Sequence, residues 1–370
     1  MTDRGGLAAF LRRAGIVLRF VFPGRAARAY AGNIRASGMF DRDFYLLSNP
    51  RLRRLFRLAP ERHYVLFGET AGLCPNAGFS PLAYRFNNPD IGDRPPLLHY
   101  IESGRAERRR VLNTDTPDLP ALPVPASGDL PDDPAPVAVA LHLYYHALWP
   151  EFAEALERQA FDFDLYVTAT GTEDDIAPLR RAIQERFPSA RVWALPNHGR
   201  DIFPFLHLLR HGVLAPYAAV CKLHSKQSPH RADGAEWRRA LTAAVLGPPE
   251  RTARRLEAFL TDPSAGLWTA PGQIHEGDAE WGMNRPRAVA LLERAGLPAP
   301  ASPLRFPAGS IWWAKPAVLE KLRALDLGAA DFEPEQALVD GTTAHAIERL
   351  MGPLTALAGQ NILTGPELDP

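Results

Sequence analysis

The stretch "VAVALHLYYHALWPEFAEALERQAFDFDLYVTAT", residues 137–170, holds two apolar runs with an amphipathic pattern between them. The runs at 137–145 and 164–170 are short and rich in Val, Leu and Tyr, which is typical of buried strands. The segment "WPEFAEALERQ" spaces its apolar residues as one face of a helix does. A strand, a helix and a second strand in this order predict two parallel neighbours in one sheet.

The same alternation continues along the chain. Two more helices, "EDDIAPLRRAIQERF" and "DIFPFLHLLRHGVL", separate two further apolar runs at 190–197 and 218–225. Four strands with three intervening helices predict an α/β fold with a Rossmann-like, mostly parallel sheet and flanking helices. Further strands are expected in "AGLWTAPG" and "FPAGSIWWAKP", and a helix in "QALVDGTTAHAIERLMG".

An internal repeat precedes the sheet. Residues 40–109 contain two copies of one pattern, in which an Asn-Pro pair is followed by a His-Tyr pair and then by a Gly. The pairs His63-Tyr64 and His99-Tyr100 stand at matching positions, as do Gly68 and Gly104. The pattern predicts two helical hairpins that form a small module, residues 37–110, with both histidines hydrogen-bonded in its core.

Composition marks the remaining boundaries. Residues 1–36 hold seven Arg and one Asp, and we expect a basic amphipathic helix that packs on the protein or docks on an anionic membrane surface. Residues 111–136 hold seven Pro, five Asp and no Lys or Arg, which predicts an extended, mobile linker. The main domain is expected to span 137–360, with 361–370 as a C-terminal tail.

Several function classes are disfavoured by the sequence. The formal net charge is zero, so nothing in the global charge suggests a nucleic-acid partner. The two cysteines lie far apart, which fits a reducing cytoplasm and gives no metal spacing. The glycine-rich motifs of dehydrogenases and phosphate-loop NTPases and the serine motif of α/β-hydrolases are absent, and no stretch is apolar enough to span a membrane. We therefore expect no bound metal and no cofactor.

Polar residues gather where the predicted strands end. Thr168, Thr170, Asn197, Lys222, His224 and Lys226 follow or end strands, and "NHGRD" places Gly199, Arg200 and Asp201 before the next helix. In parallel sheets, ligands bind outside the carboxyl ends of the strands. Arg200, Lys222 and Lys226 suit a diphosphate. Alternatively, they form ion pairs with carboxylates such as Asp201.

Another candidate group lies near the C-terminus. Asp340 precedes a predicted helix, where a carboxylate serves either as a general base or as an ordinary helix cap, and Glu335 is a second candidate base. Trp312 follows "FPAGS" and is expected either to pack in the core or to form an apolar wall for a sugar ring.

The chain resembles the rhamnan synthesis protein F family over residues 137–357. The resemblance rests on an ordered series of motifs: "LHLYYHALWPEF", "FDLYVT", "NHGRDIFPFL", "VCKLHSKQSPH", "WRRALTAAVLG", "FPAGSIWWAKP" and "DGTTAHAIERL". The helical repeat resembles the His-Tyr/Gly repeats found ahead of glycosyltransferase domains in surface-polysaccharide proteins. The predicted sheet is similar to that of A-type glycosyltransferases.

The resemblance implies transfer of a sugar from a nucleotide-activated donor, such as dTDP-rhamnose, to a growing glycan or lipid-linked glycan at the inner face of the cell membrane. Thr168, Asn197 and Asp201 would then hold nucleoside or sugar hydroxyls, and Gly309, Ser310, Trp312 and His345 would lie on the acceptor side. Many such enzymes carry an Asp-x-Asp metal motif where this chain has "CKLHSK". That difference predicts metal-independent transfer, and it leaves a second hypothesis open: a non-catalytic glycan- or nucleotide-binding subunit.

Overall fold

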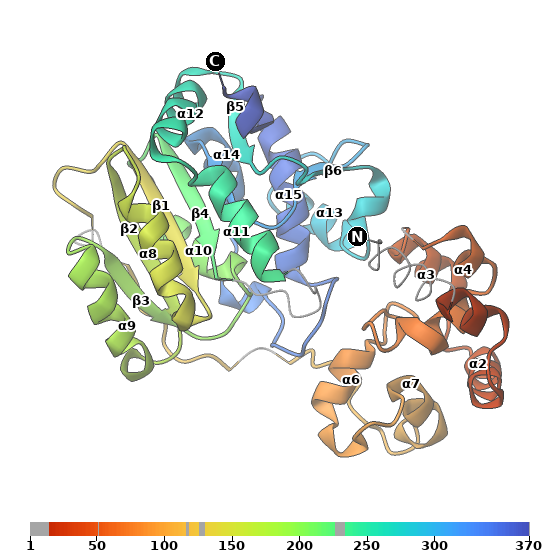
Figure 1. Ribbon diagram of the computed structural model, residues 1–370. Helices are drawn as coiled ribbons and strands as arrows, with labels where there is room; N and C mark the ends of the chain where they lie inside the picture. Colours follow the sequence, from red (N-terminus) through yellow and green to blue (C-terminus); the bar gives the residue numbers. More distant parts are fainter. Residues whose placement is uncertain (1–14, 51, 116–117, 126–129, 226–233, 370) are drawn as a thin grey trace, which may run out of the picture. The chain divides into compact units, whose positions relative to one another are not determined.

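The computed structural model describes residues 15–50, 52–115, 118–125, 130–225 and 234–369 (Figure 1). The chain forms two units. Unit 1 comprises Met1–Thr114 and Gln336–Gly341, and unit 2 comprises Asp115–Glu335 and Thr342–Pro370. Each unit has its own core.

Unit 1 is helical, as the repeat predicts. Residues 15–21 are helical, and short helices follow: α2 (Arg25–Ser37), α3 (Arg42–Ser48), α4 (Arg54–Leu58), α5 (Pro60–His63), η1 (Tyr64–Gly68), α6 (Pro81–Asn87), η2 (Pro89–Ile91), α7 (Pro96–His99) and η3 (Tyr100–Gly104). The elements η1 and η3 are single π-helical turns that carry the Tyr and the Gly of each copy.

The repeated residues make the same contacts in both copies. The hydroxyl of Tyr45 is hydrogen-bonded to Nδ1 of His63 at 2.9 Å, and the hydroxyl of Tyr84 to Nδ1 of His99 at 2.9 Å. Both histidines are buried. A Cβ atom at Gly104 would collide with the Tyr84 hydroxyl, and one at Gly68 would collide with that of Tyr45. The glycines therefore make room for the tyrosine of their own copy.

Unit 2 is built on a seven-stranded sheet with strand order β3-β2-β1-β4-β8-β5-β9. The strands are β1 (Val137–Leu143), β2 (Phe163–Thr170), β3 (Arg191–Leu195), β4 (Ala219–His224), β5 (Ala265–Thr269), β8 (Trp312–Ala314) and β9 (Asn361–Thr364). Only β8 is antiparallel to its neighbours in this sheet. A second, two-stranded sheet pairs β6 (Ile274–Glu276) with β7 (Arg305–Pro307). The mostly parallel sheet with flanking helices is confirmed.

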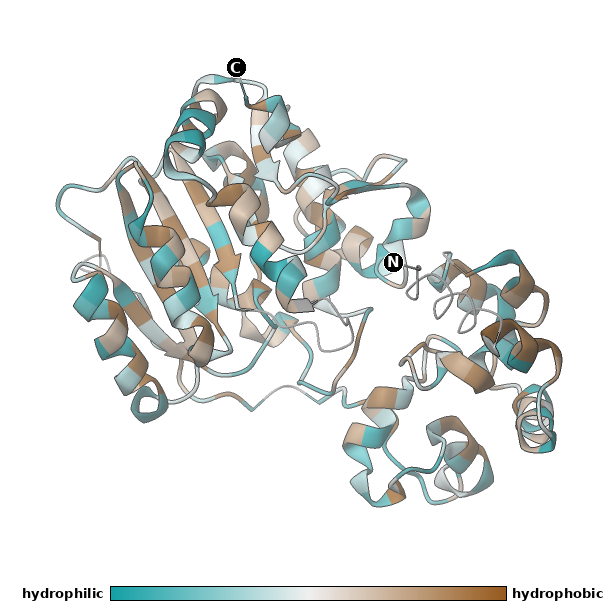
Figure 2. Ribbon diagram, in the orientation of Figure 1, coloured by the Kyte–Doolittle hydropathy of each residue, from teal (hydrophilic) through white to brown (hydrophobic). Residues whose placement is uncertain are grey.

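Two layers of helices cover the sheet. The helices α8 (Trp149–Glu157), α9 (Glu173–Arg186), α11 (Gly234–Val245) and α12 (Pro249–Thr261) contribute to the core on one face. The helices α10 (Ile202–Arg210), α13 (Arg285–Arg294), α14 (Pro316–Arg323) and α15 (Thr343–Leu357) contribute to the core on the other. In Figure 2 the central strands are largely brown and the outer helix α9 is largely teal. Among the described residues, no helix has the length and apolarity needed to cross a membrane.

The structure corrects two expected boundaries. Residues 361–370 were expected to form a tail, but Asn361–Thr364 forms β9 and pairs with β5. Residues 111–136 were expected to form a mobile linker. The described part of that segment from Asp115 onward belongs to unit 2, where Leu122 and Leu130 pack on the core and Nε2 of His207 donates to the Pro123 carbonyl at 2.7 Å. Apolar side chains between the prolines give this segment a surface on which to pack.

Candidate functional site

The carboxyl ends of β1 and β4 mark a switch point in the sheet. From β1 the chain builds β2 and β3 on one side, and it then adds β4 on the other. Loops that leave two such strands diverge and open a crevice between them, where ligands of α/β proteins bind. The ends of the two strands and the residues after them are joined: Ser225 N donates to the His142 carbonyl, and Tyr145 N donates to the Ser225 hydroxyl, each at 2.9 Å.

Lys222 and His224 of β4 lie two residues apart and therefore on the same face of the sheet. Lys222 is only 2% exposed, and its ammonium donates to Oδ2 of Asp201 at 2.6 Å and to the Ser310 carbonyl at 3.0 Å. His224 is also buried, and its Nε2 donates to the Gly309 carbonyl at 2.8 Å. β4 thus holds both the start of α10 and the turn before β8.

The turn at Gly309 and Ser310 has an unusual backbone. Both residues have a positive φ, 96° and 53°, and Ser310 accepts that conformation despite its Cβ. The Gly309 amide donates to Oε1 of Glu348 on α15 at 2.8 Å. A Cβ at Gly309 would come within 2.9 Å of Leu241. Contacts from β4, α11 and α15 therefore fix this turn. Its backbone is strained at Ser310, and strained backbone conformations cluster at functional sites.

The "NHGRD" segment brings α10 to this cluster. Gly199 and Arg200 have φ values of 58° and 59°. A Cβ at Gly199 would lie 2.8 Å from the ring of Phe332, so the close approach requires glycine. Asp201 caps α10 without a side-chain hydrogen bond to the helix, which leaves its carboxylate to Lys222. Asn197 is exposed, and Arg200 is half-buried.

The ends of β1 and β2 add a neutral histidine. Nδ1 of His142 is hydrogen-bonded to the Thr168 hydroxyl at 3.0 Å, and the Thr170 hydroxyl lies 3.4 Å from its Nε2. Burial lowers the pKa of His142 to about 3; the charge of Asp201 opposes this shift, whereas His224 and Lys222 add to it. A cavity of about 10 Å³ beside His142, Asp201 and Lys222 has room for about one water molecule.

The cluster does not fit a divalent cation. The ammonium of Lys222 occupies one oxygen of Asp201, and like charges this close in a desolvated site are costly. Among the described ranges, no group of three or more His, Cys, Asp or Glu side chains has the arrangement of a metal site.

The structure brings together most of the expected donor-side and turn residues: Thr168, Thr170, Gly199, Arg200, Asp201, Lys222, His224, Gly309 and Ser310 lie on the strand ends, the start of α10 and the turn before β8. Asn197 lies on the same loop as Gly199. Lys226 lies outside the described residues.

The other expected residues do not offer a ligand what the sequence suggested. Trp312 borders the cluster, because it pairs with Lys222 and its ring lies 5.9 Å from the Lys222 ammonium. It is only 1% exposed and packs against Phe205, so it offers no face to a sugar. His345 is on α15 and is hydrogen-bonded to the Thr342 hydroxyl at 2.8 Å. Asp340 belongs to the Gln336–Gly341 segment of unit 1, and Glu335 is exposed just before that segment.

Three members of the cluster were missed by sequence reasoning: His142, Ser225 and Glu348. Ser225 ends the predicted strand 218–225, and His142 lies three residues before the end of the predicted strand 137–145, so the rule applied to Lys222 and His224 would have selected them as well. Glu348 lies within a predicted helix, and nothing in the sequence signals its contact with Gly309.

Comparisons with known proteins place this domain in a family. The sequence model described as rhamnan synthesis protein F matches residues 120–359, which is more than half of the chain. Two curated relatives from two strains of Xanthomonas campestris pv. campestris, both called uncharacterized protein WxcX, are 35% and 34% identical over 226 residues. The match covers 61% of this chain and 32% of each relative, so the chain spans about a third of their length.

A search of solved structures finds the mannosyltransferase PcManGT from Pyrobaculum calidifontis, in complex with GDP-Man and Mn²⁺. The two chains are 16% identical with a TM-score of 0.34, and the match covers 76% of this chain and 65% of the other.

Proposed function

The chain belongs to the rhamnan synthesis protein F family, and on that premise we propose that unit 2 is a glycosyltransferase of cell-surface polysaccharide biosynthesis. It transfers a sugar such as rhamnose from a nucleoside-diphosphate donor, for example dTDP-rhamnose, to a glycan or lipid-linked glycan. The reaction takes place at the cytoplasmic face of the membrane, with residues 1–36 in peripheral contact.

One observation carries the proposal: buried polar side chains converge on the switch point between β1 and β4. Burial of an unpaired polar group costs free energy, so a cluster of this kind is retained where it holds a site in shape. Here it holds the start of α10 and the turn at Gly309 and Ser310 against β4.

We assign the donor-side residues to two roles according to how accessible their side chains are. Arg200, Thr170 and Asn197 are exposed or half-buried, and we assign them to the donor phosphates and hydroxyls. Lys226 keeps its proposed role on the diphosphate. The buried residues Lys222, His224 and Thr168 act as positioning residues, as does the half-buried Asp201, whose carboxylate is paired with Lys222. This division revises the expectation that Lys222 itself contacts the diphosphate, because its ammonium is already paired.

Three carboxylates are proposed as candidates for the base that activates the acceptor hydroxyl. Asp340 remains a candidate, with Glu335 as the alternative, although Asp340 belongs to unit 1 by its contacts. Glu348 is a further candidate, because it binds the Gly309 amide and its side chain is 22% exposed. A general base must lie within reach of the acceptor proton, and variants of each residue test this directly.

A second function is supported by the Lys222–Asp201 pair. Because the ion pair is neutral and His142 is uncharged, the described cluster offers less positive charge to a departing diphosphate than its sequence suggested. A binding subunit that holds a nucleotide or glycan without transfer needs no such charge.

The test is donor turnover by the full chain with a panel of nucleotide sugars. We expect release of the nucleoside diphosphate, and we expect it to survive EDTA because the cluster has no place for a dication. Arg200→Gln should slow turnover at least tenfold, while Arg181→Gln, an exposed residue of α9, should leave it unchanged. Glu348→Gln, Asp340→Asn and Glu335→Gln separate the three candidate bases.

Loss of turnover in EDTA with recovery in Mn²⁺ would overturn metal independence. Binding of a nucleotide sugar without any turnover, with or without an acceptor glycan, would support the binding subunit instead.

A further inference from the structure

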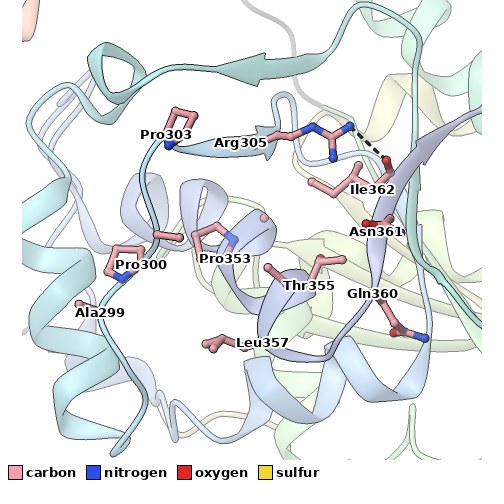
Figure 3. Close-up of a pocket in the computed structure, with 13 residues that line it drawn as sticks. Ala299, Pro300, Pro303, Arg305, Pro353, Thr355, Leu357, Gln360, Asn361 and Ile362 are labelled. Carbon is pink, nitrogen blue, oxygen red and sulfur yellow. Dashed lines mark hydrogen bonds between the residues drawn. The ribbon is translucent and has the colours of Figure 1, made fainter.

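A second cavity lies in unit 2, at the opposite edge of the sheet from the carboxyl-end cluster. It has a volume of about 270 Å³ and is formed by the segment before β7, the second half of α15 and the start of β9 (Figure 3). β9 is parallel to β5, and both run in the same direction as β4, so the start of β9 marks the amino-end edge. The cavity is therefore separate from the proposed donor site.

The walls of the cavity are rigid and apolar. Pro300, Pro303 and Pro353 contribute ring faces, and Leu357 and Ile362 contribute branched side chains (Figure 3). Because the proline rings have few conformations, the cavity keeps its shape at little entropic cost. Its volume is at the small end for ligand sites, about the size for a single ring.

Three polar side chains line the same cavity and have unused hydrogen-bonding capacity. The guanidinium of Arg305 donates only one long bond, 3.4 Å, to the Ile362 carbonyl (Figure 3). In the described part of the chain, no carboxylate lies within ion-pair distance of Arg305, and the side-chain amide of Asn361 makes no hydrogen bond. Oε1 of Gln360 is buried without a partner there.

We propose that this cavity binds a small carboxylate of monosaccharide size, such as an acidic sugar. The carboxylate pairs with Arg305, whose planar guanidinium matches it bidentately. A hydroxyl of the ligand bonds to the side-chain amide of Asn361, and the C–H face of its ring lies on the prolines. One guanidinium without a second cation suits a monoanion better than a phosphate dianion. The inference goes beyond the proposed transfer reaction and does not depend on it.

The experiment uses the full chain with glucuronate as the probe and glucose as its neutral counterpart, followed by saturation-transfer NMR and calorimetry. We expect glucuronate to bind at least tenfold more tightly than glucose, because only glucuronate gains charge-assisted hydrogen bonds from Arg305. Arg305→Gln should lower the affinity for glucuronate at least tenfold. The control Arg323→Gln, on the exposed surface of α14, should leave it unchanged.

A second variant protects the test against loss of folding. Ala356 is exposed and lines the cavity, so Ala356→Phe fills the space from the surface and should abolish binding while melting as the wild type does. A disaccharide that carries the same carboxylate distinguishes a glycan-borne acid from a free one, and either result supports the site. Equal binding of glucose, absence of binding by both acids, or unchanged affinity in Arg305→Gln would overturn the proposal.

Discussion

At the scale of single residues, the central question is whether Lys222 stabilises the fold by pairing with Asp201 or binds the diphosphate of the donor. Lys222→Ala leaves the Asp201 carboxylate beside His224 without its buried partner. Removal of one member of a buried ion pair costs about 3–5 kcal/mol, so the free energy of unfolding in urea should fall by about that amount. The double variant Lys222→Met with Asp201→Asn should recover part of the loss, because no unpaired charge remains.

Lys321→Met on α14 serves as the matched control and should change the unfolding free energy by less than about 0.5 kcal/mol. If Lys222→Ala unfolded as the wild type does and lost only nucleotide affinity, Lys222 would be a direct ligand of the diphosphate, as first expected.

His142 makes the stability of unit 2 depend on pH in the acidic range. Its ordinary pKa is 6.5, and burial lowers the pKa to about 3 in the folded state. Below pH 6.5, His142 binds a proton in the unfolded chain but stays unprotonated in the folded chain until the pH approaches 3. Stability is thus fully present above pH 6.5 and is lost as the pH falls toward 3, by up to about 1.4 kcal/mol per pH unit.

His142→Gln should remove this slope. Urea unfolding from neutral pH down to about pH 4.5 should show a smaller loss of stability for His142→Gln than for the wild type or for the control His211→Gln. Parallel curves for all three proteins would show that His142 does not control the acid response.

The positions of Lys222 and His224 followed from the sequence, but their partners did not. The ends of the apolar runs placed Lys222 and His224 at the carboxyl edge of the sheet, because strand period and length are local properties. Whether Lys222 meets a ligand or Asp201 depends on how α10 packs, which no local pattern records. The spacing of the residues in the sequence was equally consistent with a ligand and with Asp201 as the partner of Lys222.

At the scale of elements, the π-helical turns of unit 1 depend on their glycines. Gly104→Ala would drive a methyl group into the Tyr84 hydroxyl and disturb its bond to His99. We expect a loss of about 1–3 kcal/mol, as for other overpacked cores, measured by thermal unfolding. Tyr84→Phe removes the obstructing oxygen and should restore part of the loss when combined with Gly104→Ala.

Gly32 on α2 provides the control, because a Cβ there meets nothing within 4 Å. Gly32→Ala should stabilise by about 0.5–1 kcal/mol, since alanine favours helix. Equal effects of the two alanine substitutions would mean that the tyrosine contact is not what the repeat preserves.

Short elements were the hardest to foresee. β9 has four residues and β6 has three, and neither run is long enough to show a period. The strands β1, β2, β3 and β4 were foreseen because their apolar runs are bounded by helices with a clear amphipathic face. β9 exists because β5 offers it an open edge, which is a tertiary cause.

At the scale of the whole molecule, the boundary of unit 2 lies earlier than the proline content suggests. A chain that begins at Val137 lacks the packing of Leu122 and Leu130 and the bond from His207 to Pro123. We expect it to be about 2 kcal/mol less stable than a chain that begins at Asp115, because partly buried leucines each contribute up to about that much.

Leu122→Ser in the full chain should reproduce part of this difference in a thermal unfolding experiment. Identical melting of the two shortened chains would show that residues 115–136 contribute nothing to the stability of unit 2, as expected of a mobile linker.

The discontinuity of unit 1 has a consequence for the order of events during synthesis. The side chain of Gln336 both accepts from the amide of Asn113, at 2.7 Å, and donates to its carbonyl, at 2.9 Å, although the two residues lie 223 positions apart in the sequence. At a translation rate of about 5–20 residues per second, the ribosome needs about 10–50 seconds to make that interval. For this time the nascent unit 1 exists without its last segment, while the sheet strands of unit 2 emerge behind it. The first part of the chain to be made is therefore among the last to be completed.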